Sequence, residues 1–325
     1  MVYLQILGGF ILLLGGAEFL VRGAVQIAAK AGLSAMLIGM TVVAFGTSAP
    51  EFVVSLNASL DGSTGIALGN IIGSNIANIF LILGVTALFA PIVVNVRAVI
   101  RDALMVMASS ILFAWLALTG TITSLAGGIM FLLLVAYFLY SYLRERRSHR
   151  ASADLHEREA DEVQDLKMST SMAWLCLIGG LVAVAYGAEL LVTGGTVVAR
   201  GFGVSEEVIG LTLIAFGTSL PELAASVMAA LRGHTDVAIG TVIGSNLFNI
   251  MCVGGGVAVI VPLSVPEQLQ NYDLWVMMAA TVLLLAYLSI GRRIGRVDGF
   301  IFTAVYGAYI ASQAIGVDKV MGMVG

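Results

Sequence analysis

The sequence contains one segment twice, and this internal duplication limits the possible folds more than any other feature. Residues 39–80 align without a gap to residues 210–251 at an offset of 171 positions, and 22 of the 42 aligned positions are identical. The same offset aligns Glu18 with Glu189 and Asp102 with Asp273. A repeat that extends over nearly the whole chain predicts two halves of similar structure.

The composition places these halves in a membrane. Of the 325 residues, 59% are hydrophobic and 11% are charged, and the mean hydropathy is +1.00, whereas about 25% of the residues of soluble proteins are charged. No basic patch suggests a nucleic-acid partner, so the bilayer is the expected surrounding. Cys176 and Cys252 both lie in apolar segments, which is typical of buried thiols and not of a disulfide.

Ten apolar tracts approach the roughly 20 residues that cross a bilayer as a helix. They lie near 3–29, 36–60, 65–90, 98–118 and 122–143, and near 171–199, 207–231, 236–262, 270–290 and 295–316. The pattern predicts an all-α polytopic membrane protein with ten transmembrane helices. Residues 1–143 form the first five-helix repeat, 144–170 a hydrophilic linker and 171–325 the second repeat. Because each half crosses an odd number of times, the two repeats are expected to be inverted, as in many secondary transporters.

The positive charges predict the orientation. If the linker is cytoplasmic, fourteen Lys and Arg residues lie on the cytoplasmic side and only Arg200 and Lys319 lie outside. Cytoplasmic loops carry the excess of Lys and Arg. We therefore expect a protein of the plasma or inner membrane with both termini outside the cytoplasm.

The second tract of each half carries a polar stripe that contains a carboxylate. The spacing of three and four residues places its members on one helix face, and an intramembrane carboxylate indicates a functional site. The members are Thr41, Ala44, Ser48, Glu51 and Ser55, and in the second copy Thr212, Ala215, Ser219, Glu222 and Ser226; Thr47 and Thr218 lie beside the stripes.

Pro50 and Pro221 each precede the carboxylate of a stripe. Proline has no amide hydrogen and disfavours helix just before itself. We expect both helices to break there and to free the carbonyl groups near Ala44 and Ala215 for a cation.

The third tract of each half adds hydroxyl and amide groups. Ser74 and Asn78 share one helix face, and so do Ser245 and Asn249. Asn75 and Asn246 point elsewhere and are expected to form hydrogen bonds between helices. Carboxylate, amide, hydroxyl and carbonyl oxygens without His, Cys or Met are typical of sites for hard cations such as calcium and sodium. Two carboxylates balance the charge of one calcium ion.

The paired motifs GTSAPE (46–51) with GSNIAN (73–78), and GTSLPE (217–222) with GSNLFN (244–249), resemble the two alpha-repeats of the calcium/cation antiporter superfamily, in particular prokaryotic sodium/calcium exchangers. The resemblance implies ten helices in two inverted halves, a central site for sodium and calcium, no resident cofactor, and alternating access by sliding of the first and sixth helices. The metal ligands that it implies are Ala44, Thr47, Ser48, Glu51, Ser74, Asn78, Ala215, Thr218, Ser219, Glu222, Ser245 and Asn249.

Other interpretations remain. A proton-coupled calcium antiporter is the main alternative, although that branch typically has Glu where this chain has Asn78 and Asn249. An enzyme is not expected, because the three His residues lie in loops and no base accompanies Ser48 or Ser219. A passive channel fits broken helices in inverted halves less well.

Three other features depart from the motifs or lie outside them. Asn249 stands where some relatives carry Asp, which bears on stoichiometry and potassium dependence. Glu18 could line the passage or form a local pair with Arg22. Asp102 and Asp273 are expected to cap helix ends or to reach the membrane surface.

Overall fold

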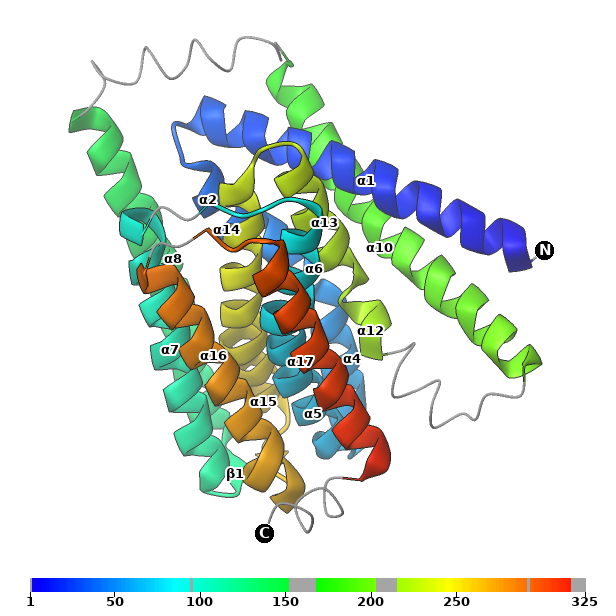
Figure 1. Ribbon diagram of the computed structural model, residues 1–325. Helices are drawn as coiled ribbons and strands as arrows, with labels where there is room; N and C mark the ends of the chain where they lie inside the picture. Colours follow the sequence, from blue (N-terminus) through cyan, green and yellow to red (C-terminus); the bar gives the residue numbers. More distant parts are fainter. Residues whose placement is uncertain (1, 94–95, 152–167, 203–214, 291–292, 317–325) are drawn as a thin grey trace.

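The computed structural model describes residues 2–93, 96–151, 168–202, 215–290 and 293–316, and these residues are almost entirely helical (Figure 1). The π-helical turns are labelled η. The elements of the first half are α1 (Val2–Ala31), α2 (Ala35–Ile38), η1 (Gly39–Val43), α3 (Ala44–Thr47), α4 (Ala49–Leu60), α5 (Thr64–Ala77), η2 (Asn78–Ile82), α6 (Leu83–Phe89), α7 (Val96–Leu118), β1 (Thr121–Ile122) and α8 (Ser124–Ala151).

The second half has a similar order of helices. Its elements are α10 (Thr170–Gly201), α12 (Ala215–Thr218), α13 (Leu220–Leu231), α14 (Thr235–Leu247), η4 (Phe248–Gly254), α15 (Gly255–Ile260), β2 (Leu263–Ser264), η5 (Leu269–Asp273), α16 (Leu274–Ile290) and α17 (Arg296–Ile315). Thr212 and the beginning of the 207–231 tract lie outside the described residues.

Seven helices in the described ranges are long and apolar enough to cross a membrane, or up to eight if the bent pair Ala35–Thr47 and Ala49–Leu60 is one span. Many large apolar side chains on the outer helices are exposed, among them Phe10, Trp115 and Leu132. Such a surface is expected where lipid and not water is the solvent. The protein is a multi-pass membrane protein.

The third helices of the two halves form the interior of the bundle. In the spans 64–89 and 235–260, 78% of the apolar window is buried, compared with 33% in α1 and 28% in α10. Gly62 and Gly233, which the duplication aligns, precede these two spans with φ angles of 80° and 81°. Glycine adopts this left-handed conformation without a steric penalty, so both copies turn in the same way from the second helix into the third.

The first helices of the two halves, α1 and α10, lie side by side on one flank of the bundle (Figure 1). Glycine permits this contact, because a Cβ atom at Gly9 would lie 2.9 Å from the Gly187 carbonyl oxygen, and one at Gly180 would lie 2.7 Å from the Gly16 carbonyl oxygen. Residues with increasing numbers along α1 contact residues with decreasing numbers along α10, so the helices are antiparallel. At the offset of 171, Gly9 corresponds to Gly180 and Gly16 to Gly187. The contact of Gly9 with Gly187 is therefore equivalent to the contact of Gly180 with Gly16, with the two halves exchanged.

Two short β contacts interchange in the same way. β1 pairs with β2 in antiparallel register, with Ile122 opposite Leu263, and Ile92 forms an antiparallel bridge with Ile294. Ile92 corresponds to Leu263 at the offset of 171, and Ile294 corresponds to the residue after Ile122. The two pairings lie beyond opposite ends of α7, as expected if one half is turned over relative to the other.

The last helix of the first half is longer than its apolar tract. The tract was expected near 122–143, and α8 continues from Ser124 to Ala151. The physical reason is local, because Leu143, Arg144, Glu145 and Arg146 all favour helix.

Candidate functional site

The second helix of the first half breaks at Ser48. α3 ends at Thr47, α4 begins at Ala49, and the two segments meet at an angle of 42°. Ser48 has φ −87° and ψ 5°, and Pro50 occupies the first turn of α4. In the second half Ser219 has φ −88° and ψ 0° between α12 and α13. Both breaks predicted from proline are confirmed.

The breaks place Glu51 and Glu222 in the first turns of α4 and α13. The free amide groups of a helix N-terminus carry partial positive charge and favour a carboxylate there. Both carboxylates are nevertheless almost fully buried, each with 1% of its surface exposed. Two buried negative charges are costly unless a cation or a proton balances them.

Each carboxylate is held by hydroxyl groups of the opposite half. The Ser48 hydroxyl donates a hydrogen bond to Glu222 Oε1 at 2.9 Å, and the Thr47 hydroxyl lies beside this carboxylate. The Thr218 hydroxyl lies beside the Glu51 carboxylate. The two halves therefore build one site between them and not one site each.

The interior helices α5 and α14 supply the remaining predicted groups. Ser74 lines a cavity together with Thr218 and Ser219. Asn78 begins the π-helical turn η2, and Asn249 is the second residue of η4. Single π turns widen the backbone and are common at functional sites, and no residue pattern in the sequence predicted them.

Several buried polar atoms in these residues have no hydrogen-bond partner within the described ranges. They are Glu51 Oε2, Glu222 Oε2, Asn78 Nδ2, Ser245 Oγ, and Asn249 Oδ1 and Nδ2. Buried oxygens without a partner are costly, and a bound cation would satisfy them. The oxygen chemistry fits calcium or sodium, and the described residues contain no group of three His, Cys, Asp or Glu that could hold another metal.

The structure brings the predicted ligands together only in part. Thr47 and Ser48 contact Glu222, Thr218 contacts Glu51, and Ser74 shares the cavity wall with Ser219. The described contacts do not join Asn78, Ser245 or Asn249 to the carboxylates. Ala215 begins α12, and its side chain is outside the described parts.

The expected release of the Ala44 carbonyl is wrong. This oxygen accepts a hydrogen bond from Ser48 N at 2.9 Å and one from Thr47 Oγ1 at 3.4 Å. The missing amide is that of Pro50, and its partner in a regular helix would be the Gly46 carbonyl. Ala44 keeps its backbone bond, so its carbonyl would coordinate a cation only if the Thr47 hydroxyl turned away from the second lone pair.

Two other expectations also fail. Asn75 donates to Ile71 O at 2.8 Å and Asn246 to Val242 O at 2.7 Å. Each bond stays within its own helix, because a short polar side chain can reach the carbonyl group one turn earlier. Asp102 and Asp273 are not helix caps, since both are buried and accept hydrogen bonds from tyrosines of the following helices.

Asn70 was missed by sequence reasoning. Its amide donates to Glu51 O at 3.1 Å and to Ser55 Oγ at 2.9 Å, which fixes α5 against α4 beside the carboxylate. The second half has Thr241 at this position. Because the two copies differ at this position, a comparison of the copies does not identify Asn70.

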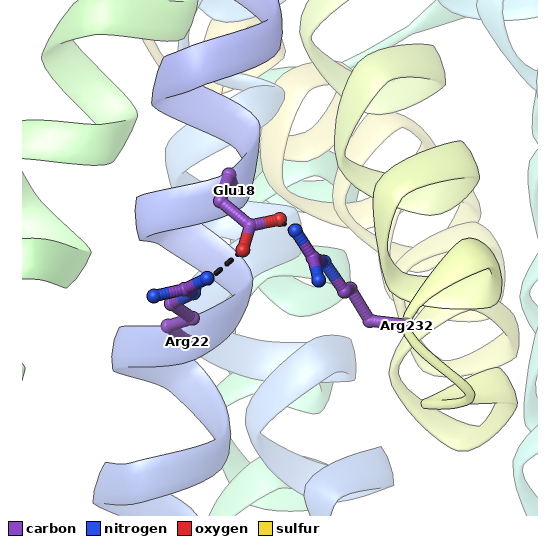
Figure 2. Close-up of polar contacts among 3 residues, drawn as sticks. All are labelled: Glu18, Arg22 and Arg232. Carbon is purple, nitrogen blue, oxygen red and sulfur yellow. Dashed lines mark hydrogen bonds and ion pairs between the residues drawn. The ribbon is translucent and has the colours of Figure 1, made fainter. Parts of the chain in front are cut away.

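Glu18 forms the expected local pair and a second pair that was not expected. Its carboxylate accepts from Arg22 Nε at 2.5 Å and from Arg232 Nε at 2.8 Å (Figure 2). Arg232 follows α13, so the second bond joins α1 to the helix that carries Glu222. Glu189 is exposed, so the two aligned glutamates differ in environment.

Comparison with known proteins decides the family. The family model described as sodium/calcium exchanger protein matches residues 1–143 and 172–314. The chain belongs to the sodium/calcium exchanger family. Members of this family are membrane transporters and not enzymes.

Individual relatives are similar to this chain over nearly their whole length. The putative antiporter CaxA of Alkalimonas amylolytica is 39% identical over 315 residues, which cover 94% of this chain and 96% of CaxA. The sodium/calcium exchanger MaX1 of Methanosarcina acetivorans is 32% identical over 339 residues, covering 95% and 97% of the two chains. A solved structure of the sodium-calcium exchanger NCX_Mj has a TM-score of 0.83 at 32% identity and covers 96% of this chain and 98% of its own.

Proposed function

We propose that the protein exchanges sodium for calcium across the membrane by alternating access. The ions bind at the contact between the two halves, where hydroxyls of one half meet the carboxylate of the other. The proposed ligands are the groups named from the sequence: Ala44, Thr47, Ser48, Glu51, Ser74, Asn78, Ala215, Thr218, Ser219, Glu222, Ser245 and Asn249.

The observation that carries the proposal is the pair of buried glutamates. Glu51 and Glu222 each have one carboxylate oxygen without a partner in the described ranges, and together they supply two negative charges. One calcium ion neutralises both and takes 6 to 8 oxygens at about 2.3 to 2.6 Å in a flexible geometry. Sodium ions suit the same oxygens, so the two cations would compete for one site and would therefore be exchanged.

The proposed architecture has ten transmembrane helices in two inverted five-helix repeats, with a cytoplasmic linker at 144–170 and both termini outside. The interchanged contacts of Gly9 and Gly180, and those of Ile92 and Leu263, support the inversion. Inverted repeats allow the same site to be reached from either side of the membrane in turn. The excess of Lys and Arg on one side supports the orientation.

Calcium-45 uptake into proteoliposomes tests the function. The purified protein is reconstituted with sodium inside, and uptake is compared with vesicles that contain potassium, lithium or an outward proton gradient. We expect rapid uptake only with the outward sodium gradient, and we expect external sodium to abolish it. The Glu51→Gln/Glu222→Gln variant is the control for leakage.

A proton-coupled calcium antiporter is the alternative that this experiment separates. Two buried carboxylates could carry protons in place of sodium. Uptake driven by the proton gradient and indifferent to sodium would replace our proposal with this alternative.

A further inference from the structure

Asp273 is a further buried carboxylate, and it lies outside the set of ligands proposed above. Its side chain is 2% exposed, and its Oδ2 atom has no hydrogen-bond partner within the described ranges. Only two other carboxylate oxygens in the described ranges share this condition, and they belong to Glu51 and Glu222. Asp273 therefore has the same unmet need for positive charge as the proposed ion ligands.

The duplicated half provides an internal comparison. Asp102 occupies the corresponding position, is equally buried, and accepts from Tyr137 of α8 as Asp273 accepts from Tyr309 of α17. Asp102 is neutralised by Arg101, whose Nε and Nη2 lie 2.8 and 2.7 Å from Asp102 Oδ1.

The second half lacks this arginine. Tyr272 stands where the first half has Arg101, and its hydroxyl bonds to Ser312 Oγ at 2.8 Å. Asp273 receives the amide of Gln313 instead, on the same oxygen that accepts from Tyr309. Within the described ranges no Lys, Arg or His forms an ion pair with Asp273. Both aspartates are thus buried and accept a hydrogen bond from a tyrosine. Within the described ranges only Asp102 also forms an ion pair with an arginine.

The position of Asp273 suggests what balances it. Asp273 lines a cavity of about 480 Å³ whose wall also includes Ser74, Thr218 and Ser219 from the proposed ion site, together with Gln268 and Gln313. The cavity therefore extends from Asp273 to hydroxyl-bearing residues of the proposed ion site. Asp102 is not among the residues that line this cavity.

We propose that Asp273 binds a cation in this cavity, as a station separate from the central site. The ligands are Asp273 Oδ2, the Gln268 amide oxygen and water, because the Gln313 amide oxygen accepts a hydrogen bond from Gln268 Nε2 at 3.4 Å. One negative charge and few protein oxygens suit a partly hydrated monovalent ion, whereas calcium prefers several carboxylates. That the ion is sodium rests on the proposed function; that a cation is bound there does not.

Sodium-22 binding to the purified full-length protein tests the station with the central site disabled. In Glu51→Gln/Glu222→Gln we expect weak, saturable sodium binding to remain. Adding Asp273→Asn should weaken that binding at least tenfold. Adding Tyr272→Arg should weaken the binding as well, although the carboxylate is kept, because the new arginine would pair with Asp273 as Arg101 pairs with Asp102. Asp61→Asn, which removes an exposed carboxylate in the turn after α4, should leave it unchanged.

Flux provides the second readout. Asp273→Asn alone should raise the sodium concentration for half-maximal calcium exchange several-fold without changing calcium affinity. If neither Asp273→Asn nor Tyr272→Arg changes sodium binding in the double variant, the proposed cation site at Asp273 is wrong. If calcium flux proves independent of sodium, the proposed function fails, but the binding series still decides whether Asp273 holds a cation.

Discussion

Replacing Glu222 with Gln removes one of the two negative charges at the proposed site and changes little else. The glutamine side chain has the same shape, and its amide oxygen can still accept the hydrogen bond that the Ser48 hydroxyl now donates to Glu222 Oε1 at 2.9 Å. A calcium ion would then face a single buried negative charge, that of Glu51. Removing one partner from a buried charge arrangement costs about 3 to 5 kcal/mol.

That cost corresponds to calcium binding weakened by roughly a hundredfold to several thousandfold. The assay is equilibrium binding of calcium-45 to the purified protein in sodium-free buffer. Glu189→Gln is the matched control, because it makes the same chemical change at an exposed glutamate, and it should bind calcium as the wild type does.

Thermal unfolding separates lost binding from lost structure. Without cations, Glu222→Gln should be no less stable than the wild type, because one of two buried like charges is gone. Added calcium should raise the melting temperature of the wild type but not that of the variant. Unchanged calcium affinity in Glu222→Gln would refute the reasoning, because the charge of Glu222 would then play no part in binding.

Three further predictions follow from other parts of the structure. Gly180→Ala should destabilise the protein by about 1–3 kcal/mol, because the new Cβ atom would lie 2.5 Å from Leu20 N. At Gly179 a Cβ atom would meet nothing within 4 Å, so Gly179→Ala should be neutral or stabilising in thermal melts. Asn249→Asp should strengthen sodium or proton competition against calcium uptake, because a third negative charge over-charges the calcium form; unchanged competition by both ions would count against it. Single cysteines at Arg147 and Asp61, in a background without Cys176 and Cys252, should be labelled from opposite sides of the membrane, and labelling from the same side would contradict the proposed topology.

The sequence predicted the parts of the site that depend on local spacing. Pro50 and Pro221 identified the helix breaks because the missing amide hydrogen is a property of the residue itself. The stripe from Ala44 to Ser55 was read correctly as one buried face, since four of its members, Ala44, Ser48, Glu51 and Ser55, are buried. These features require only the period of an α-helix.

Contacts between the halves were beyond the reach of the sequence. The duplication relates Ser48 to Ser219, but it does not reveal that Ser48 bonds to Glu222 of the other half. The bond from Arg232 to Glu18 is of the same kind, because it joins residues 214 positions apart. The exchange of Arg101 for Tyr272 is visible in the alignment, but its meaning depends on the burial of Asp273, which only the folded chain provides.

The location of the bound ion is the most direct test of the account. A crystal structure of the protein with calcium, with the ion identified by its anomalous scattering, should contain a calcium ion between Glu51 and Glu222. Its distance from an oxygen of each carboxylate should be about 2.3 to 2.6 Å, and sodium should displace it. A calcium ion bound elsewhere in a transport-competent protein, with both glutamates free of the ion, would contradict the claim that the two halves form one cation site.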